Sequence, residues 1–320
     1  MLLLFLAACG GGDGGGDSGD VDAGDDPDGP PMDCVCPDGP AMNPLDGIGQ
    51  VTLVGSGYMF TEGPQWRPSA DEFVFSDIPA NTIYRWSEGA GAPTVFRTPS
   101  GNANGLAVDT TGAVLLACEH GNRRVSRGDG ASPATVVDRF EGMRLNSPND
   151  LTVGQDGTIY FTDPPYGIND AQRELSFMGV FRVTPSGTIT AEYRGALSER
   201  PNGIALWPFA PPRLYVGDSE ASTVHVFDVA TNGTLSNRRL FVNTAGTPDG
   251  MAIDTSGNLF VATSAGVQVF SPSGASWGTI SVPMQPSNVA FGGADSQTLL
   301  ITARTAVYRV RLANPGWPRF

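Results

Sequence analysis

Short apolar runs recur along residues 50–320 at intervals of roughly 45 residues. One run in each interval follows a gap that contains Gly, Asp or Pro; these runs read FVFSD, VLLAC, IYFTD, LYVGD, LFVAT and LLITA. A further run follows in most intervals, such as TIYRW, GVFRV, TVHVF, VQVF and AVYRV, and a fourth in several, such as PTVFR, TITAEY and RRLFV. Runs of this length with alternating or continuous apolar residues predict β-strands.

Each interval also begins with a similar left edge. The six edges read EGPQW from 62, NGLAV from 104, NDLTV from 149, NGIAL from 202, DGMAI from 249 and SNVAF from 287. Three or four short strands per repeat of this length are typical of a β-propeller blade, so six repeats predict an all-β, six-bladed β-propeller. The last repeat lacks an outer strand, which the run GQVTLVG at 49–55 can supply. Such pairing closes the ring and makes residues 47–320 one domain.

The N-terminal nine residues, MLLLFLAAC, predict a lipoprotein signal. Small residues before Cys9 resemble a bacterial lipobox, in which the Cys is lipidated, and the apolar run is too short to span a bilayer. We therefore expect an exported bacterial lipoprotein that is anchored to a membrane through Cys9. The alternative is a buried N-terminal strand.

Residues 10–46 have the composition of a flexible tether. Gly, Asp and Pro dominate this segment, which cannot bury enough apolar surface to offset the entropy of ordering. Cys34 and Cys36 lie within it and leave open a disulfide or a metal site. Cys118, within the run AVLLAC, is expected to be a buried core thiol.

The charge is distributed unevenly. The chain has a net charge of −14, and residues 1–46 hold ten Asp and no basic residue. Residues 47–320 carry 23 acidic residues against 19 Arg, with no basic cluster of the kind that neutralises phosphates. We therefore expect no nucleic-acid partner. The protein is also expected to be a monomer.

The left edges are the candidate functional site. The innermost strands of a propeller surround its central channel, so the first residues of six inner strands should converge; they are Glu62, Asn104, Asn149, Asn202, Asp249 and Ser287. Mixed carboxylate and amide oxygens suit calcium, while the lack of His and Cys argues against zinc. The alternative is turn chemistry, because Asn-Gly and Asp-Gly are common turn dipeptides. Glu62 and the pair Asn149-Asp150 do not fit that alternative.

Several motifs resemble those of a known family. TEGPQW, NSPNDLTV, YFTDPPYG, RPNGIAL and TPDGMAID occur in order over residues 50–320, together with ACEHGNRRVSR. With these motifs the chain resembles the gluconolactonase/regucalcin (senescence marker protein) family of six-bladed propellers, and most closely its bacterial gluconolactonase branch. The resemblance implies a sugar-lactone hydrolase in which one divalent cation, taken to be Ca²⁺, is bound by Glu62, Asn149, Asn202 and Asp249. Regucalcin-like members commonly have an Arg, which contacts the sugar, where this chain has Ser147.

Other residues are expected near the mouth of the channel. His120 ends an inner-blade strand and should lie above the cation, where it could contact substrate or carry a proton. Asp163 and Tyr166, in TDPPYG, could bind sugar hydroxyls, or the Pro pair there could only set a rigid turn. Together with these three, the expected substrate-binding residues are Asn104, Asp150, Ser287 and Asn288. Asp218 is expected to face the pocket, whereas Asp77 and His225 are expected to be structural.

These patterns favour a metal-dependent hydrolase of sugar lactones. Asp249 is the candidate general base, with Asp150 and His120 as alternatives. One rival is a non-enzymatic propeller that binds a ligand or protein, with calcium only bracing the channel. Another keeps hydrolysis but acts on an aryl ester or phosphotriester. No G-x-S-x-G motif of a serine nucleophile occurs in the sequence.

Overall fold

A computed structural model describes residues 43–317 of the chain. These residues form short strands and one 3-10 helix, η1 (Asp170–Gln172), and contain no α-helix. Within them, no helix is long and apolar enough to cross a membrane. The predictions for Cys9, the tether up to residue 42, and the pair Cys34 and Cys36 lie outside the described residues.

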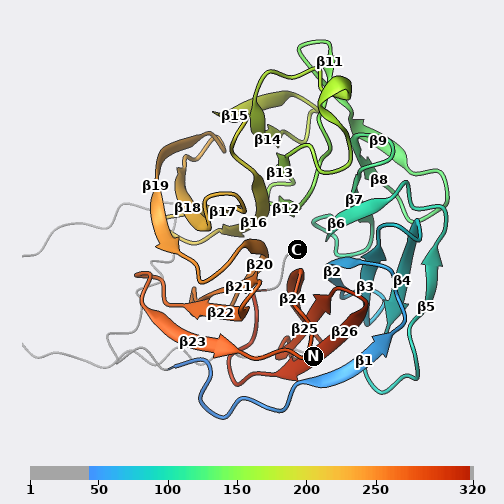
Figure 1. The fold of residues 1–320 in the computed structure, drawn as a ribbon, viewed down its shortest axis with the longest axis vertical. Helices are drawn as coiled ribbons and strands as arrows, with labels where there is room; N and C mark the ends of the chain where they lie inside the picture. Colours follow the sequence, from blue (N-terminus) through green and yellow to red (C-terminus); the bar gives the residue numbers. More distant parts are fainter. Residues whose placement is uncertain (1–42, 318–320) are drawn as a thin grey trace, which may run out of the picture. The chain divides into compact units, whose positions relative to one another are not determined.

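Six four-stranded antiparallel sheets, numbered here as blades 1 to 6, surround a common centre (Figure 1). Blade 1 holds β2 (Thr61–Arg67), β3 (Glu72–Asp77), β4 (Thr82–Trp86) and β5 (Thr94–Arg97). Blade 2 holds β6 (Ala103–Val108), β7 (Leu115–Glu119), β8 (Arg124–Arg127) and β9 (Ala134–Val137). Blade 3 holds β12 (Leu151–Val153), β13 (Ile159–Asp163), β14 (Met178–Val183) and β15 (Ile189–Gly195).

The remaining blades follow the same order from the centre outward. Blade 4 holds β16 (Pro201–Trp207), β17 (Arg213–Asp218), β18 (Thr223–Val229) and β19 (Leu235–Asn243). Blade 5 holds β20 (Pro248–Ile253), β21 (Leu259–Thr263), β22 (Gly266–Phe270) and β23 (Ser276–Ile280). Blade 6 holds β24 (Asn288–Gly292), β25 (Thr298–Ala303), β26 (Ala306–Arg311) and, as its outer strand, β1 (Thr52–Ser56). A separate hairpin joins β10 (Arg139–Phe140) to β11 (Met143–Arg144).

The N-terminal strand closes the ring. β1 pairs antiparallel with β26, from Thr52 opposite Arg309 to Ser56 opposite Ala306. Each inner strand contacts the inner strand of the next blade, and β24 contacts β2 across the closure. The predicted six-bladed propeller, with its last blade completed by an N-terminal strand, is confirmed.

Apolar side chains between neighbouring sheets hold the blades together. Phe161 and Phe181, opposite each other on two strands of blade 3, are fully buried and stack with ring centroids 5.2 Å apart, and they belong to one apolar cluster with Leu116 of blade 2. Burying one such side chain contributes about 1.5–3 kcal/mol to the free energy of unfolding. The outer strands bury less surface, as the exposed Val95 in β5 shows. The most deeply buried part of each blade is therefore its inner half, which carries the left edges.

Two details differ from the prediction. Residues 43–46, assigned to the tether, are ordered: the Asn43 side chain accepts a hydrogen bond from the Leu45 N–H at 3.0 Å, and Leu45 packs against the core of blades 5 and 6. The ordered part therefore begins before residue 47, because Leu45 can bury its side chain there. The hairpin β10–β11 was not predicted, since its strands of two residues are too short to show a period.

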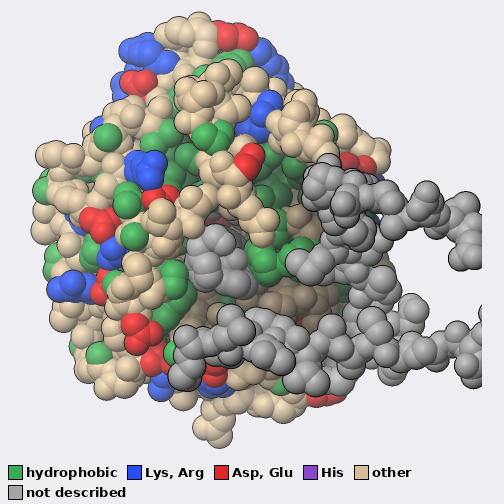
Figure 2. Space-filling view, turned by 180° about the vertical axis from the view of Figure 1, so that it is seen from behind, with side chains coloured by type: hydrophobic (Ala, Val, Ile, Leu, Met, Phe, Trp, Pro, Cys, Tyr) green, Lys and Arg blue, Asp and Glu red, His purple; other side chains and the backbone are tan. Residues whose placement is uncertain are grey.

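The face turned away from Figure 1 has a mixed surface. Figure 2 shows acidic, basic and hydrophobic side chains interspersed over the coloured parts of this face. In the described residues the only cysteine is Cys118, which is free and buried, as expected.

Candidate active site at the channel mouth

Breaks in the strand pairing place the left edges at the channel. In four blades the register between the inner strand and its neighbour shifts at the left edge, between Glu62 and Gln65, Ala103 and Leu106, Pro201 and Ile204, and Pro248 and Met251. Such β-bulges leave residues outside the ladder and redirect their side chains. The polar residue of each edge is thereby turned out of its own sheet.

The freed backbone groups bond to the next inner strand. Gly105 N–H donates to the Asn149 carbonyl at 2.8 Å, and Gly250 N–H donates to the Ser287 carbonyl at 2.8 Å. A Cβ atom at Gly203 would overlap the backbone of Asp249, and one at Gly250 would overlap the Asn288 side chain. The glycines therefore follow the polar residues because neighbouring strands approach closely there.

Three amides from consecutive blades form a hydrogen-bonded chain. Asn104 Nδ2 donates to Asn149 Oδ1 at 2.6 Å, and Asn149 Nδ2 donates to Asn202 Oδ1 at 2.6 Å. Asn202 Nδ2 donates to Ser219 Oγ at 2.9 Å, and Ser219 donates to the Pro248 carbonyl at 2.8 Å. Each amide oxygen has a second lone pair that remains available to a cation. This chain of hydrogen bonds fixes the orientation of each amide, because the partners determine which amide atom is the oxygen and which is the nitrogen.

The Glu62 carboxylate is held in place from across the closure. Glu62 Oε2 accepts hydrogen bonds from Gly63 N–H at 2.9 Å and from Asn288 Nδ2 at 3.1 Å. Asn288 Oδ1 in turn accepts from Val289 N–H at 2.8 Å, which fixes the direction of its amide. Asn288 thus positions Glu62, and its contact with substrate stays a prediction.

Three carboxylates at the mouth repel one another. Burial raises the pKa of Glu62 well above its usual range, and the charges of Asp249 and Asp150 raise it further. Burial raises the pKa of Asp249 to about 7, with a further rise from Asp150, while Asn202 and Arg304 oppose it. Buried carboxylates in mutual repulsion are stabilised by a cation, so the donors fit one.

The donor set is a mixed one of carboxylates and amides. In the described part of the chain, no group of three or more His, Cys, Asp or Glu side chains is placed to hold a metal ion. The candidate ligands Glu62, Asn149, Asn202 and Asp249 include only two carboxylates. Neutral oxygen donors of this kind are normal for calcium and unusual for zinc.

His120 lies beside the amide chain. It follows β7, the second strand of blade 2 counted from the channel. Its Nε2 is 3.2 Å from Asn104 Nδ2, and because an amide nitrogen only donates, Nε2 is the acceptor. Burial lowers the pKa of His120 to about 4, so the ring is neutral near pH 7.

Tyr166 stands at the mouth above blade 4. Its side chain is 47 % exposed. Burial of the hydroxyl raises the pKa of Tyr166, and hydrogen bonds with Ser219 and Asn202 oppose that rise. This phenol therefore lies within reach of a molecule bound over Asn202.

The other predicted residues lie behind the mouth. Asp163 is fully buried, and its two carboxylate oxygens accept from Asn146 N–H and Ser147 N–H at 2.7 Å each. These bonds anchor the loop that leads to Asn149, and contact of Asp163 with substrate stays a prediction. Ser287 Oγ donates to the Thr61 carbonyl at 2.7 Å, which joins blades 6 and 1.

The acidic residues at corresponding places in other blades act in the same way. Asp77 accepts from the N–H groups of Met59 and Phe60, and Asp218 accepts from the N–H of Arg200 at 3.1 Å. Asp77 is structural, as expected. His225 lies in β18, where its Nδ1 is 3.3 Å from Arg238 Nη2.

A family profile matches most of the folded part. Residues 60–305 match the family described as SMP-30/Gluconolactonase/LRE-like region. The chain belongs to this family. A gluconolactonase from Zymomonas mobilis is 36 % identical over 304 residues, which cover 85 % of this chain and 84 % of that protein.

Solved structures of similar proteins share the architecture. A gluconolactonase from Xanthomonas campestris has a TM-score of 0.76 and 32 % identity, over 82 % of this chain and 89 % of that chain. A regucalcin from Agrobacterium tumefaciens, described as a calcium-binding protein, has a TM-score of 0.68 and 18 % identity, over 85 % of this chain and 96 % of that one. The second likeness shows the shared fold alone.

Two residues of this family member were missed by sequence reasoning. Ser219 joins Asn202 to blade 5, and Arg304 places a positive charge near Asp249. Ser219 follows the β17 carboxylate Asp218 and Arg304 lies in a hairpin turn, so neither belongs to a repeated left edge. Only their three-dimensional contacts reveal them.

Proposed function

We propose that this protein is a metal-dependent hydrolase that opens sugar lactones to the corresponding hydroxy acids. The observation that carries the proposal is the set of oxygen donors brought to one channel mouth by four blades. Membership in the SMP-30/gluconolactonase family, and relatives named gluconolactonase, support lactones as the substrate class.

The cation would be held by Glu62, Asn149, Asn202 and Asp249, and we propose calcium. Two observations support this cation site. Burial and the charge of Asp249 raise the pKa of Glu62, and the hydrogen-bonded chain fixes the amide oxygens of Asn149 and Asn202. A bound divalent cation supplies Lewis-acid polarisation of a carbonyl oxygen.

Protons are moved by side chains of the mouth. Asp249 is our candidate general base: it would take a proton from the water that attacks the lactone carbonyl carbon. The ring C–O bond then breaks, and the ring oxygen takes that proton from Asp249 and leaves as a hydroxyl group. Burial and the neighbouring Asp150 raise the pKa of Asp249 to about 7 in the cation-free site, and a bound cation would lower it, so that Asp249 would be ionised and able to accept a proton near neutral pH. Asp150 and His120 are the alternatives for this role.

The test is hydrolysis of D-glucono-δ-lactone by the full chain. Activity should be lost after chelation and return when calcium is added, and Asp249→Asn should lower kcat. A chain that binds calcium but hydrolyses no lactone, aryl ester or phosphotriester would be a binding module and would overturn the proposal. Hydrolysis of the esters alone would replace the substrate class.

We further propose that Cys9 carries the lipid anchor of an exported lipoprotein. The support is the sequence LAAC at residues 6–9, which resembles a lipobox. Lipid attachment would place the lactonase at a membrane surface.

A further inference from the structure

The turn between β25 and β26 holds an arginine that its backbone does not favour. Ala303 pairs with Ala306, so Arg304 and Thr305 form a two-residue turn, and Arg304 has a φ of 52°. Positive φ favours Gly, Asn or Asp in such turns. A residue held against this preference often has a functional reason.

The backbone of Arg304 is fixed beside the strand that carries Glu62. Its carbonyl oxygen accepts from Thr61 N–H at 2.7 Å and from Thr61 Oγ1 at 3.2 Å. Any residue could supply this carbonyl, so these bonds do not explain an arginine. The reason for the arginine must lie in its side chain.

The Arg304 guanidinium is oriented but not neutralised. Its carbon lies 5.3 Å from the centroid of the Phe60 ring, and Nη2 donates to Gln285 Oε1 at 2.6 Å. Among residues 43–317, no carboxylate oxygen lies within 4.0 Å of its nitrogens. A neutral amide and an aromatic face therefore hold an exposed cation in one place.

A second arginine with positive φ shows the structural use of such a position. Arg123 has a φ of 55°, but its Nε donates to the carbonyls of Leu145 and Asn146 at 2.8 and 2.9 Å. Its buried side chain thus ties two loops together. Arg304 is exposed and makes no such bond to the backbone.

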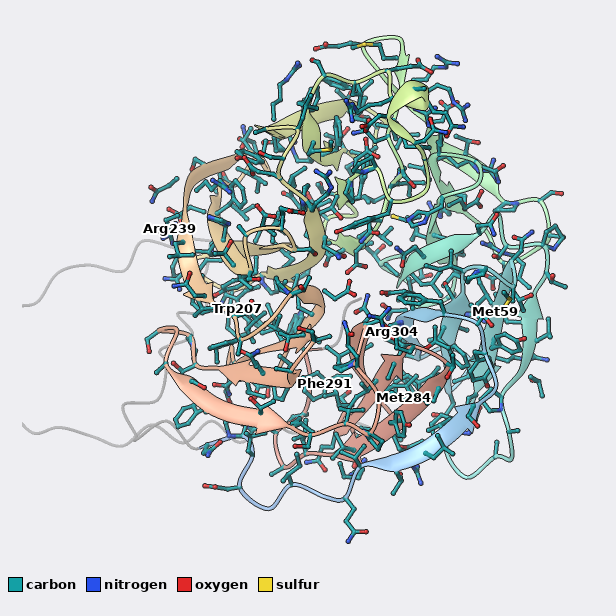
Figure 3. All side chains as sticks on the ribbon, viewed as in Figure 1. Met59, Trp207, Arg239, Met284, Phe291 and Arg304 are labelled. Carbon is teal, nitrogen blue, oxygen red and sulfur yellow. The ribbon has the colours of Figure 1, made fainter. Side chains whose placement is uncertain are left out.

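The position of Arg304 faces the mouth of the channel. Figure 3 shows it near the centre of the ring, beside β24, whereas Arg239 lies at the outer rim of blade 4. Its charge reaches the Asp249 carboxyl, whose pKa it helps to lower against the effects of burial and Asp150. A molecule bound over Asp249 would therefore meet the free N–H groups of Arg304.

We propose that Arg304 is a specificity-determining residue that donates hydrogen bonds to the hydroxyl oxygens of the lactone substrate. The assignment rests on the proposed lactonase function. Neutral hydroxyl groups fit better than an anionic substituent, because an anion would also meet the carboxylates of Glu62, Asp150 and Asp249. Arg304 thus selects polyhydroxylated lactones over the bare ring.

The test compares two lactones on four metal-loaded full-length proteins: wild type, Arg304→Asn, Arg304→Lys and Arg239→Gln. D-glucono-δ-lactone carries hydroxyl groups, and δ-valerolactone has the same ring without them. Where δ-valerolactone is hydrolysed too slowly for kcat/KM to be measured, its inhibition constant against D-glucono-δ-lactone is measured instead. Arg304→Asn should lower kcat/KM for the hydroxylated lactone by roughly ten- to hundredfold, through KM, as expected for a lost charged hydrogen bond. The kcat/KM or inhibition constant for δ-valerolactone should change less than about twofold, because this lactone has no hydroxyl groups that could lose a hydrogen bond.

Stability and a matched variant separate contact from folding. Asn accepts positive φ more readily than Arg, so Arg304→Asn should melt no lower than wild type. Arg239→Gln removes a half-buried arginine of the outer rim, paired with Asp228 at 2.8 Å, and should leave hydrolysis of both lactones unchanged. Arg304→Lys should retain part of the preference, because it keeps the charge but loses the planar fork.

Three results would overturn the assignment. Equal losses for both lactones would mean that Arg304 acts only through the charge of Asp249. No loss for either would mean that it does not contact substrate. A wild-type protein that hydrolyses neither lactone would overturn the proposed function first, and this assignment with it.

Discussion

Removing one carboxylate should stabilise the chelated protein while it abolishes activity. Asp249→Asn keeps the size of the side chain but removes a charge that faces Glu62 and Asp150. In the presence of a chelator these charges oppose folding, so we expect the variant to melt at a higher temperature than wild type at pH 8. Most substitutions of buried polar residues have the opposite effect.

The raised pKa of Asp249 also determines how the stability of the chelated protein changes with pH. The pKa of Asp249 is raised from 3.8 to about 7 by burial and by Asp150. A carboxyl with a raised pKa binds more protons in the folded state than in the unfolded state. Its contribution to stability is therefore complete below about pH 4 and is lost as pH rises toward 7. Chelated wild type should melt lower at pH 8 than at pH 5, and Asp249→Asn should show a smaller difference.

The size of the stability change follows from the pKa shift of Asp249. Three pKa units correspond to about 4 kcal/mol, which is an upper bound for one group. Asp249 is partly exposed, so solvent reduces the effect, and we expect about 1–2 kcal/mol. For a domain of this size 1 kcal/mol shifts the melting temperature by roughly 2–4 °C.

The assay is thermal unfolding followed by circular dichroism, with chelator or calcium, at both pH values. Calcium should raise the melting temperature of wild type more than that of Asp249→Asn, and more at pH 8 than at pH 5. If chelated Asp249→Asn melts below wild type at pH 8, the carboxylates do not repel one another as the structure indicates. A melting temperature of chelated wild type that is independent of pH would refute the reasoning equally.

Four further substitutions test other parts of the molecule. Asn202→Ala should weaken calcium affinity, with activity partly restored by excess calcium, whereas Asn104→Ala should do so less; calcium titrations that show equal, calcium-insensitive losses would contradict the ligand assignment. Asp163→Asn replaces one acceptor of the Asn146 and Ser147 N–H groups by a donor, and should lower the free energy of unfolding in urea by about 1–3 kcal/mol; an unchanged value would show that the loop is held elsewhere. Cys9→Ser should release the protein from membranes in fractionation, and continued membrane association would rule out the lipid anchor.

The repeat in the sequence was sufficient to predict the propeller and its convergent edges. Each blade must bury the same two faces, so its apolar runs recur, and the chain can close only when residues near 52 pair with those near 309. The edges converge because every inner strand starts at the same end of the channel. Family motifs then separated Glu62 and Asp249 from ordinary turn residues.

Contacts between edges could not be predicted in the same way. Whether Asn288 binds substrate or holds Glu62 depends on how β24 lies against β2, and no repeat length encodes that. The roles of Asp163 and Ser287 depend likewise on backbone groups of neighbouring loops. Arg304 could not be identified from the sequence, because a turn residue of unfavourable φ is not part of any periodic pattern.

The hydrogen bond from Asn288 to Glu62 joins residues 226 positions apart, and this separation has a consequence for synthesis. A ribosome makes Glu62 early and Asn288 near the end of the chain. The nascent protein therefore carries a carboxylate without its amide partner until the sixth blade has emerged and closed against the first. High-affinity calcium binding should consequently appear only at full length, so that a truncated translation product has no lactonase activity, however many of its blades have folded.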